Sequence, residues 1–176
     1  ACKVGGERMK QIVKAFPGDV RLVYRHYPLP NHPEAPLASE AALAVRAQKG
    51  DAGFFAYHDK LYGHQHDLSR PVLDKLAKEL GVDMARFKKA LDGRTFKAVV
   101  DRDLKFAQTM GVMGTPAFYI NGKVLVGVPP FDQLKKRIQD EIAAAKLKLK
   151  GGVTRANLYE HLQKDAKTKP VFVKPQ

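Results

Sequence analysis

The segment from Gly114 to Val126 constrains the fold more than any other part of the chain. Two short apolar runs, 117–120 and 123–126, flank the dipeptide Asn121-Gly122. Asn-Gly between such runs is the strongest short-range signal for a two-residue β-hairpin, because both turn residues adopt positive φ. Pro116 precedes the first run, at the point where a strand tolerates a residue that has no N–H. The sequence therefore predicts a hairpin that opens with a proline.

A helix and a strand are predicted near the start of the chain. Apolar residues follow helical spacing at Met9, Ile12, Val13 and Phe16. Pro17-Gly18 ends this helix, and residues 20–24 then read as a strand because they are mostly β-branched, aromatic or aliphatic.

A long helical region is predicted from about residue 35 to 110. Its helical segments are expected at about 37–49, 51–62, 70–80, 84–91 and 95–110. Ser69 and Asp83 are the predicted N-caps of the third and fourth segments. We expect these helices to share one core, to contain no strand, and to pack over the face that carries the functional site.

The chain after the hairpin is predicted to contain two helices and a tail. Phe131, Leu134, Ile138 and Ile142 fall on one face of a helix that starts near Pro130. Thr154 is suited to cap a short helix that runs to about residue 164. Residues 170–176 read as a linker or free tail.

Composition excludes several protein classes. The chain has 176 residues, of which 44% are hydrophobic, so it can bury a core and does not resemble a disordered protein. It has no apolar run near the roughly 20 residues that span a bilayer. A single cysteine, Cys2, excludes an internal disulfide framework and a thiolate zinc site.

The net charge of +13 makes an acidic partner plausible, whether nucleic acid, an anionic membrane or an acidic protein. Solvated helix faces explain most of these cations more simply, because many alternate with acidic residues. The sequence lacks the aromatic and basic interleaving or helix-turn-helix spacing of nucleic-acid binders, so nucleic acid is not the favoured partner. Lys146, Lys148 and Lys150 lie at a helix C-terminus, where the dipole favours cations.

The order of elements is typical of one α/β plan. Helix, strand, helical block, hairpin and helix together indicate a thioredoxin-like fold with an inserted helical subdomain, whose first strand is missing from the chain. The expected boundaries are 1–34 and 111–150 for the core, 35–110 for the insertion, and 151–176 for a C-terminal helix and tail.

Two segments resemble a known family. Residues 114–123, GTPAFYINGK, are similar to the G-T-P-x-F-x-I-N-G-x segment of DsbA-like thiol:disulfide oxidoreductases. Residues 17–29, PGDVRLVYRHYPL, resemble the second strand of that family and its exit loop. The resemblance covers roughly residues 1–147.

The resemblance implies a redox function. The family carries C-x-x-C at the start of its first helix, and Cys2 fits the second cysteine, with the first expected three positions earlier, outside the chain. A thiolate at that place is stabilised by unpaired N–H groups and the helix dipole. The resemblance assigns Cys2, Thr115 and Pro116 to the catalytic site and implies a cis Thr115–Pro116 bond.

The alternative is a redox-inactive thioredoxin-like module that binds proteins. In the leading hypothesis, the partners are protein thiols or disulfides and a redox partner protein, the compartment is periplasmic or otherwise exported, and no small-molecule cofactor is needed. No metal site is expected, although His64 and His66 could bind a metal and His58 lies near them in the sequence. His26 and His32 flank a proline-rich loop, where a surface role is expected.

A missing first strand leaves a structural problem. That strand would lie between residues 20–24 and the hairpin, so its absence exposes backbone N–H and C=O groups on both neighbours. Val171-Phe172-Val173 is the only spare β-like segment in the chain, and prolines flank it. We therefore expect the strand to lie just upstream, together with the first cysteine.

Overall fold

The computed structural model describes residues 1–164 and 171–172. The chain divides into two compact units, the first made of residues 1–24 and the chain from 108 onward, the second of residues 25–107. Each unit is described by itself. The boundaries 1–34, 35–110, 111–150 and 151–176 stay a prediction.

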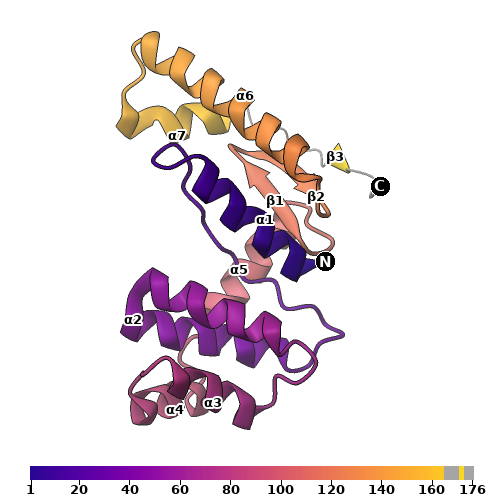
Figure 1. Cartoon of the computed structure of the whole chain (residues 1–176), viewed down its shortest axis with the longest axis vertical. Helices are drawn as coiled ribbons and strands as arrows, with labels where there is room; N and C mark the ends of the chain where they lie inside the picture. The colour runs from indigo at the N-terminus through magenta and orange to yellow at the C-terminus, as the bar shows by residue number, and fades with distance from the viewer. Residues whose placement is uncertain (165–170, 173–176) are drawn as a thin grey trace. The chain divides into compact units, whose positions relative to one another are not determined.

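The hairpin forms as the sequence predicts (Figure 1). β1, Ala117–Ile120, pairs antiparallel with β2, Lys123–Val126, and Ala117 lies opposite Val126. The turn residues Asn121 and Gly122 have φ of 48° and 82°, as a two-residue turn requires. The pairing continues one step further, because the N–H of Gly127 donates to the carbonyl of Pro116 at 2.9 Å.

A third strand joins the hairpin in the segment predicted to be a linker or free tail, at the residues also noted in the sequence as the spare β-like segment. β3, Val171–Phe172, pairs parallel with β2, which gives the order β1-β2-β3. The prediction was wrong for these two residues, because β2 presents an edge to which a short β-branched and aromatic segment can add. The rest of the predicted tail, Pro170 and residues 173–176, lies outside the described residues. Since β3 flanks β2, it leaves the outer edge of β1 unoccupied by any described strand.

The predicted strand at residues 20–24 is not formed. The backbone there is assigned to no regular element, and the side chains of Val23 and Tyr24 are exposed. A strand exists only through its hydrogen-bonded neighbours, and no described segment pairs with this one. Residues 20–24 therefore form a connection outside the described strands, although residues of these types are common in strands.

Two helices pack with the hairpin to form the core of the first unit. α1 spans Cys2–Ala15 and α6 spans Phe131–Lys150. The buried residues of this core are Ile12, Leu125, Leu134 and Ile138, with Met9, Phe16, Val20, Phe118, Ile120, Phe131 and Ile142 partly buried around them. The predicted inward face of α6 is thereby confirmed, whereas Val13 of the predicted α1 stripe is 40% exposed.

A buried carboxylate ties α6 to the hairpin turn. Glu141 is 5% exposed, and its Oε1 accepts a hydrogen bond from Lys123 Nζ at 2.6 Å. Asn121 Nδ2 lies 3.5 Å from the other oxygen. Because a buried carboxylate requires partners, these contacts help to fix the turn against the helix. α7, Arg155–Lys164, follows α6 and begins where Thr154 Oγ1 accepts from the N–H of Asn157.

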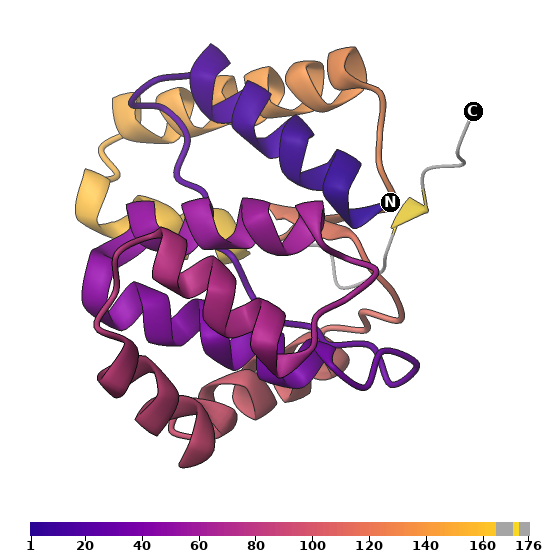
Figure 2. The same cartoon turned by 60° about the horizontal axis from the view of Figure 1, so that its bottom comes forward.

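The second unit is helical throughout, as predicted (Figure 2). α2 spans Ala35–Gly63, with a break at Gly50 whose φ of 68° and ψ of −165° separate the two predicted helical segments. α3 spans Arg70–Glu79, α4 Met84–Asp92 and α5 Lys97–Thr109, and α5 crosses the boundary between the units. Asp83 caps α4 through the N–H of Arg86, whereas Ser69 precedes α3 without a side-chain cap. The predicted position of this region over the active site stays a prediction.

The helices of the second unit share one core, and the buried carboxylate of Glu40 forms an ion pair with Arg94. Tyr57, Leu73, Leu76, Phe87 and Leu91 are almost fully buried in this core. Glu40 is 0% exposed, and both of its oxygens accept hydrogen bonds from the guanidinium of Arg94, at 2.6–3.2 Å. Within the described ranges, no helix combines the length and the apolar character needed to cross a membrane.

Candidate functional site

Cys2 is the first helical residue of α1. Ala1 occupies the N-cap position, and its carbonyl accepts the N–H of Gly5 at 3.0 Å. The first N–H groups of a helix have no intrahelical acceptor, so the amino end of α1 carries partial positive charge beside this sulfur. Cys2 is partly exposed and is a free thiol.

The loop before β1 brings Thr115 to the cysteine. Cys2 Sγ lies 3.2 Å from Thr115 Oγ1, with the thiol placed to donate to the hydroxyl. The Thr115–Pro116 bond is cis, which is the isomer that the family resemblance implies. All three residues predicted for the site therefore lie at one place, although they are separated by more than a hundred positions in the chain.

Gly5 is a residue of this site that the sequence did not reveal. It is buried, one helical turn after Ala1, and it faces the proline. A Cβ at this position would lie 3.2 Å from Pro116 Cγ and 3.2 Å from Phe118 Cζ. Those distances are tighter than normal van der Waals contact, so the missing side chain allows α1 to approach the Pro116 ring. A glycine within a helix that begins at a cysteine was the one feature of the sequence that could have indicated a role for Gly5.

Apolar surface is exposed in the loop that leads to Thr115. Met113 is 90% exposed, and the preceding Val112 is buried, so the loop alternates between inward and outward side chains. Tyr119 of β1 donates from its hydroxyl to the carbonyl of Met110 at 2.9 Å, which ties the loop to the strand. Met is a flexible side chain that suits varied apolar partners.

His26 is buried, contrary to the surface role predicted for it. Its side chain is 4% exposed, and its ring contacts Phe54 edge-on at 5.8 Å between centroids. Its backbone N–H donates to Asp103 Oδ2, while Arg25 Nη1 donates to Oδ1 at 3.0 Å. Burial lowers the pKa of His26 to about 4 despite the nearby Asp103 carboxylate. The surface role was predicted only because His26 lies beside a proline-rich loop in the sequence. The packing of Phe54 on its ring is a contact between distant residues, which the sequence does not show.

The remaining histidines form no metal site in the described part of the chain, where no group of three His, Cys, Asp or Glu side chains converges. His58 packs against Tyr62 and lies 3.3 Å from Asp59 through Nδ1. His64 Nδ1 lies 3.0 Å from the carbonyl of Lys60. His32 is exposed.

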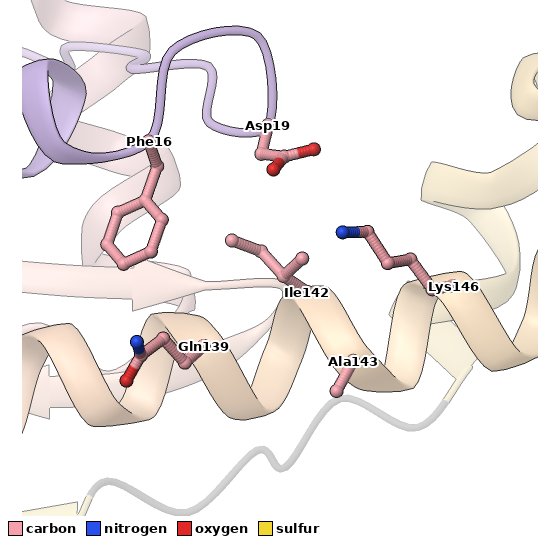
Figure 3. Close-up of a pocket in the computed structure, with 6 residues that line it drawn as sticks. All are labelled: Phe16, Asp19, Gln139, Ile142, Ala143 and Lys146. Carbon is pink, nitrogen blue, oxygen red and sulfur yellow. The ribbon is translucent and has the colours of Figure 1, made fainter.

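Two surface pockets lie away from Cys2. The first, of about 290 Å³, is lined by Phe16, Asp19, Gln139, Ile142, Ala143 and Lys146, all in the first unit (Figure 3). The second, of about 320 Å³, is lined by Arg25, Arg102, Asp103 and Phe106 in the second unit. Neither pocket contains a residue of the site predicted from the sequence.

Relatives of the chain include proteins named for disulfide chemistry and proteins named for ion transport. It is 30% identical over 132 residues to the probable disulfide bond formation protein D of Bacillus cereus, covering 71% of this chain and 59% of that protein. It is 35% identical over 134 residues to the Na(+)/H(+) antiporter NhaA 3 of Salinispora tropica, covering 76% of this chain and 20% of the antiporter. The chain therefore spans only part of the length of these relatives.

The fold is also that of a solved structure. The thiol-disulfide exchange protein alpha-DsbA2 from Wolbachia pipientis matches with a TM-score of 0.70 at 21% identity, over 79% of this chain and 74% of that one. The model of the DSBA-like thioredoxin domain matches residues 1–139, which is most of the chain. With the hairpin, the inserted helices and the segment predicted from residues 114–123 all in place, the chain belongs to the family of DSBA-like thioredoxin domains.

Proposed function

We propose that the protein exchanges disulfides with protein thiols, and that Cys2 is the second cysteine of a C-x-x-C motif. The observation that carries this proposal is the 3.2 Å contact between Cys2 Sγ and Thr115 Oγ1 at the start of α1. Membership of the DSBA-like family supports the reaction class. The first cysteine of the motif would lie three positions before Cys2 in the longer protein.

The reaction is a pair of thiol–disulfide exchanges. In the oxidising direction a substrate thiolate attacks the first cysteine, the enzyme S–S bond breaks, and Cys2 leaves as a thiolate. A second substrate thiolate then attacks the substrate sulfur of the mixed disulfide and releases the first cysteine as a thiolate. The substrate loses two electrons and the enzyme gains them. A redox partner protein then accepts these electrons, so the cycle needs no small-molecule cofactor.

Thr115 acts on Cys2 through its hydroxyl. When Cys2 is the leaving group its sulfur becomes negative, and a hydroxyl at 3.2 Å can rotate its hydrogen toward that sulfur. Hydrogen bonds to an ionised partner are stronger than those between neutral groups. In this proposal the Thr115 hydroxyl stabilises the Cys2 sulfur as it leaves the disulfide, which makes the disulfide form of the site more oxidising.

A protein substrate would bind beside Thr115 as an added strand. The backbone at Thr115, in the loop before β1 and the cis proline, would form the hydrogen bonds with an extended substrate segment. The exposed Met113 adds an adaptable apolar contact in the same loop. Such a site would select extended, unfolded segments over folded ones.

Thiol counting on the full-length protein, with the residues that precede Ala1, tests the proposal. We expect two reactive thiols after reduction and none after oxidation. A Cys2→Ser variant should accumulate a mixed disulfide with a cysteine-containing peptide, because its first cysteine has no internal partner. The dithiol mechanism fails if no cysteine lies three positions before Cys2.

A protein-binding module without redox activity is the second candidate. The observation that favours it is the single cysteine in this chain together with the exposed Met113. A binding module would retain its affinity for unfolded peptides when Cys2 is changed to Ser and would lose it in Met113→Asp. An oxidoreductase would lose turnover in the Cys2 variant.

The proposed compartment is periplasmic or otherwise exported. Net formation of disulfides requires an oxidising environment, since cytosolic thiols are kept reduced. Fractionation of cells that express the full-length protein would test this. Recovery of the protein solely from the reducing compartment would contradict an oxidase role.

A further inference from the structure

The net positive charge of the chain is concentrated in the first unit. There, Lys and Arg outnumber Asp and Glu by 17 to 7 in residues 1–24 and 108–176, compared with 14 to 11 in residues 25–107. The longest cationic stretch without a carboxylate in α6 and α7 runs from Ile142 to Tyr159 and holds four cations. Solvated faces with alternating charges, such as those of the second unit, do not explain this stretch.

The C-terminal end of α6 and the following helix α7 carry these cations together with exposed apolar side chains. Lys146, Leu147 and Lys150 lie on one helix face, because they are spaced three and four residues apart. All three are exposed, and Leu147 is 69% exposed. Arg155 and Tyr159 are exposed on α7, where Tyr159 is 70% exposed. These five residues are called the α6–α7 strip.

Intramolecular contacts do not account for the strip. Within the described residues none of Lys146, Lys150 and Arg155 forms an ion pair. By contrast Lys136, earlier on α6, pairs with Asp140 at 2.9 Å. The helix dipole favours cations in the last turn of α6, but it gives no reason for an exposed leucine between two of them.

Two carboxylates lie beside the strip: Asp19, and Glu160, which is exposed and follows Tyr159 on α7. Asp19 and Lys146 are on facing walls of the pocket between the end of α1 and α6 (Figure 3). Asp19 therefore offsets part of the charge of Lys146, and the two carboxylates together are fewer than the three cations of the strip. The strip as a whole stays positive.

We propose that the α6–α7 strip lies against an anionic lipid bilayer. Exposed lysines are strongly hydrated point charges on flexible stems, and protein interfaces are depleted in Lys and enriched in Arg. Three of the four cations between residues 142 and 159 are lysines. The exposed Leu147 of α6 and the exposed Tyr159 of α7 suit the boundary between headgroups and acyl chains, where amphipathic rings accumulate. Nucleic acid would satisfy the cations but would not take up Leu147.

In this proposal the cations provide the affinity for the anionic bilayer, and the apolar side chains determine how deeply the strip enters the headgroup region. A Lys or Arg close to an anionic membrane strengthens binding about fivefold, and the attraction is screened by salt. α6 and α7 follow each other in the chain and are joined through Gly151-Gly152 (Figure 1). We therefore expect reversible surface binding of the whole chain and no insertion across the bilayer.

Sedimentation with vesicles tests the proposal on the whole chain. We expect the protein to bind vesicles that contain phosphatidylglycerol, to bind neutral phosphatidylcholine vesicles far less, and to dissociate at high salt. Lys146→Gln combined with Lys150→Gln should weaken binding about 25-fold, that is fivefold for each cation. The matched control is Lys78→Gln with Lys89→Gln, which removes the same charge from exposed positions of α3 and α4 and should weaken binding less than twofold.

A fluorescent reporter tests the contact itself. The chain contains no tryptophan, so Leu147→Trp introduces a single one into the strip. Its emission should shift to the blue with anionic vesicles and stay unchanged with neutral ones. Far-UV circular dichroism checks that each variant keeps its helices.

Three results would overturn the proposal. Equal binding to neutral and anionic vesicles would remove the electrostatic argument. An equal loss of vesicle binding in the control double variant would show that the net charge of the protein causes the binding, wherever the cations lie. Binding to a DNA duplex that depends on Lys146 and Lys150, without binding to vesicles, would assign the strip to nucleic acid.

Discussion

Gly5→Ala tests whether the contact between α1 and Pro116 controls the candidate site. In a helix interior, replacing Gly with Ala stabilises by about 0.5–1 kcal/mol, because the unfolded chain loses freedom. The added methyl group, however, would lie 3.2 Å from Pro116 Cγ, 3.3 Å from Pro116 Cβ and 3.2 Å from Phe118 Cζ. Overpacking of this kind costs about 1–3 kcal/mol. We expect a net destabilisation between roughly zero and 2 kcal/mol, which by itself is a weak discriminator.

Gly63→Ala provides the comparison that makes the result decisive. Gly63 is helical, in α2, and a Cβ there would meet no atom within 4 Å. It should gain up to about 1 kcal/mol with no packing cost. The difference between the two variants, roughly 1–3 kcal/mol, measures the cost of displacing the Pro116 ring.

Two measurements separate the local effect from the global one. Urea unfolding followed by circular dichroism gives the free energy of unfolding, and hydrogen exchange of α1 peptides reports the first unit alone. The alkylation rate of Cys2 should also change in Gly5→Ala, because Pro116 carries Thr115 with it. A Gly5→Ala protein that is as stable as Gly63→Ala, with an unchanged alkylation rate, would refute the close approach of α1 to Pro116.

Three further predictions concern single contacts. Thr115→Val should shift the redox potential of the full-length protein while the unfolding midpoint changes little, because the lost hydroxyl contacts the Cys2 sulfur; equal potentials would contradict its role. Arg94→Ala should destabilise by about 3 kcal/mol in urea unfolding, because it leaves the buried Glu40 charge unpaired, and Glu40→Gln should cost less because it removes that charge. His26 has its pKa lowered to about 4 by burial, so its contribution is complete above the unfolded value of 6.5 and is lost as pH falls toward 4. Between pH 7 and 5 the protein should lose about 2 kcal/mol more than His26→Gln, as measured by urea unfolding, and parallel profiles would exclude His26 as the cause.

Local sequence signals were sufficient for most of the elements. The turn at Asn121-Gly122 and the inward face of α6 follow from positive φ and from the spacing of apolar residues, and both are formed. The break at Gly50 is also local, since glycine adopts its φ of 68° without a steric cost. The residues of the candidate site were found through the segment around Pro116, which resembled a family.

Contacts between distant segments decided the rest. The strand predicted at residues 20–24 is not formed and Val171–Phe172 became one, because a strand depends on the partner beside it more than on its own composition. His26 is buried because Phe54, far along the chain, packs on its ring. The pairing of Glu40 with Arg94 likewise joins positions that no periodicity connects.

The sequence by itself determined where helices and the hairpin form, since caps, turns and apolar spacing act over a few residues. It also placed a proline before β1, whereas the position of Cys2 at the start of a helix came from the family resemblance. Only the tertiary structure decided that the sulfur of Cys2 meets the hydroxyl of Thr115, because that distance depends on how closely α1 can approach Pro116. Gly5 allows this approach, and the effect of one absent methyl group is visible only when both sides of the contact are in place.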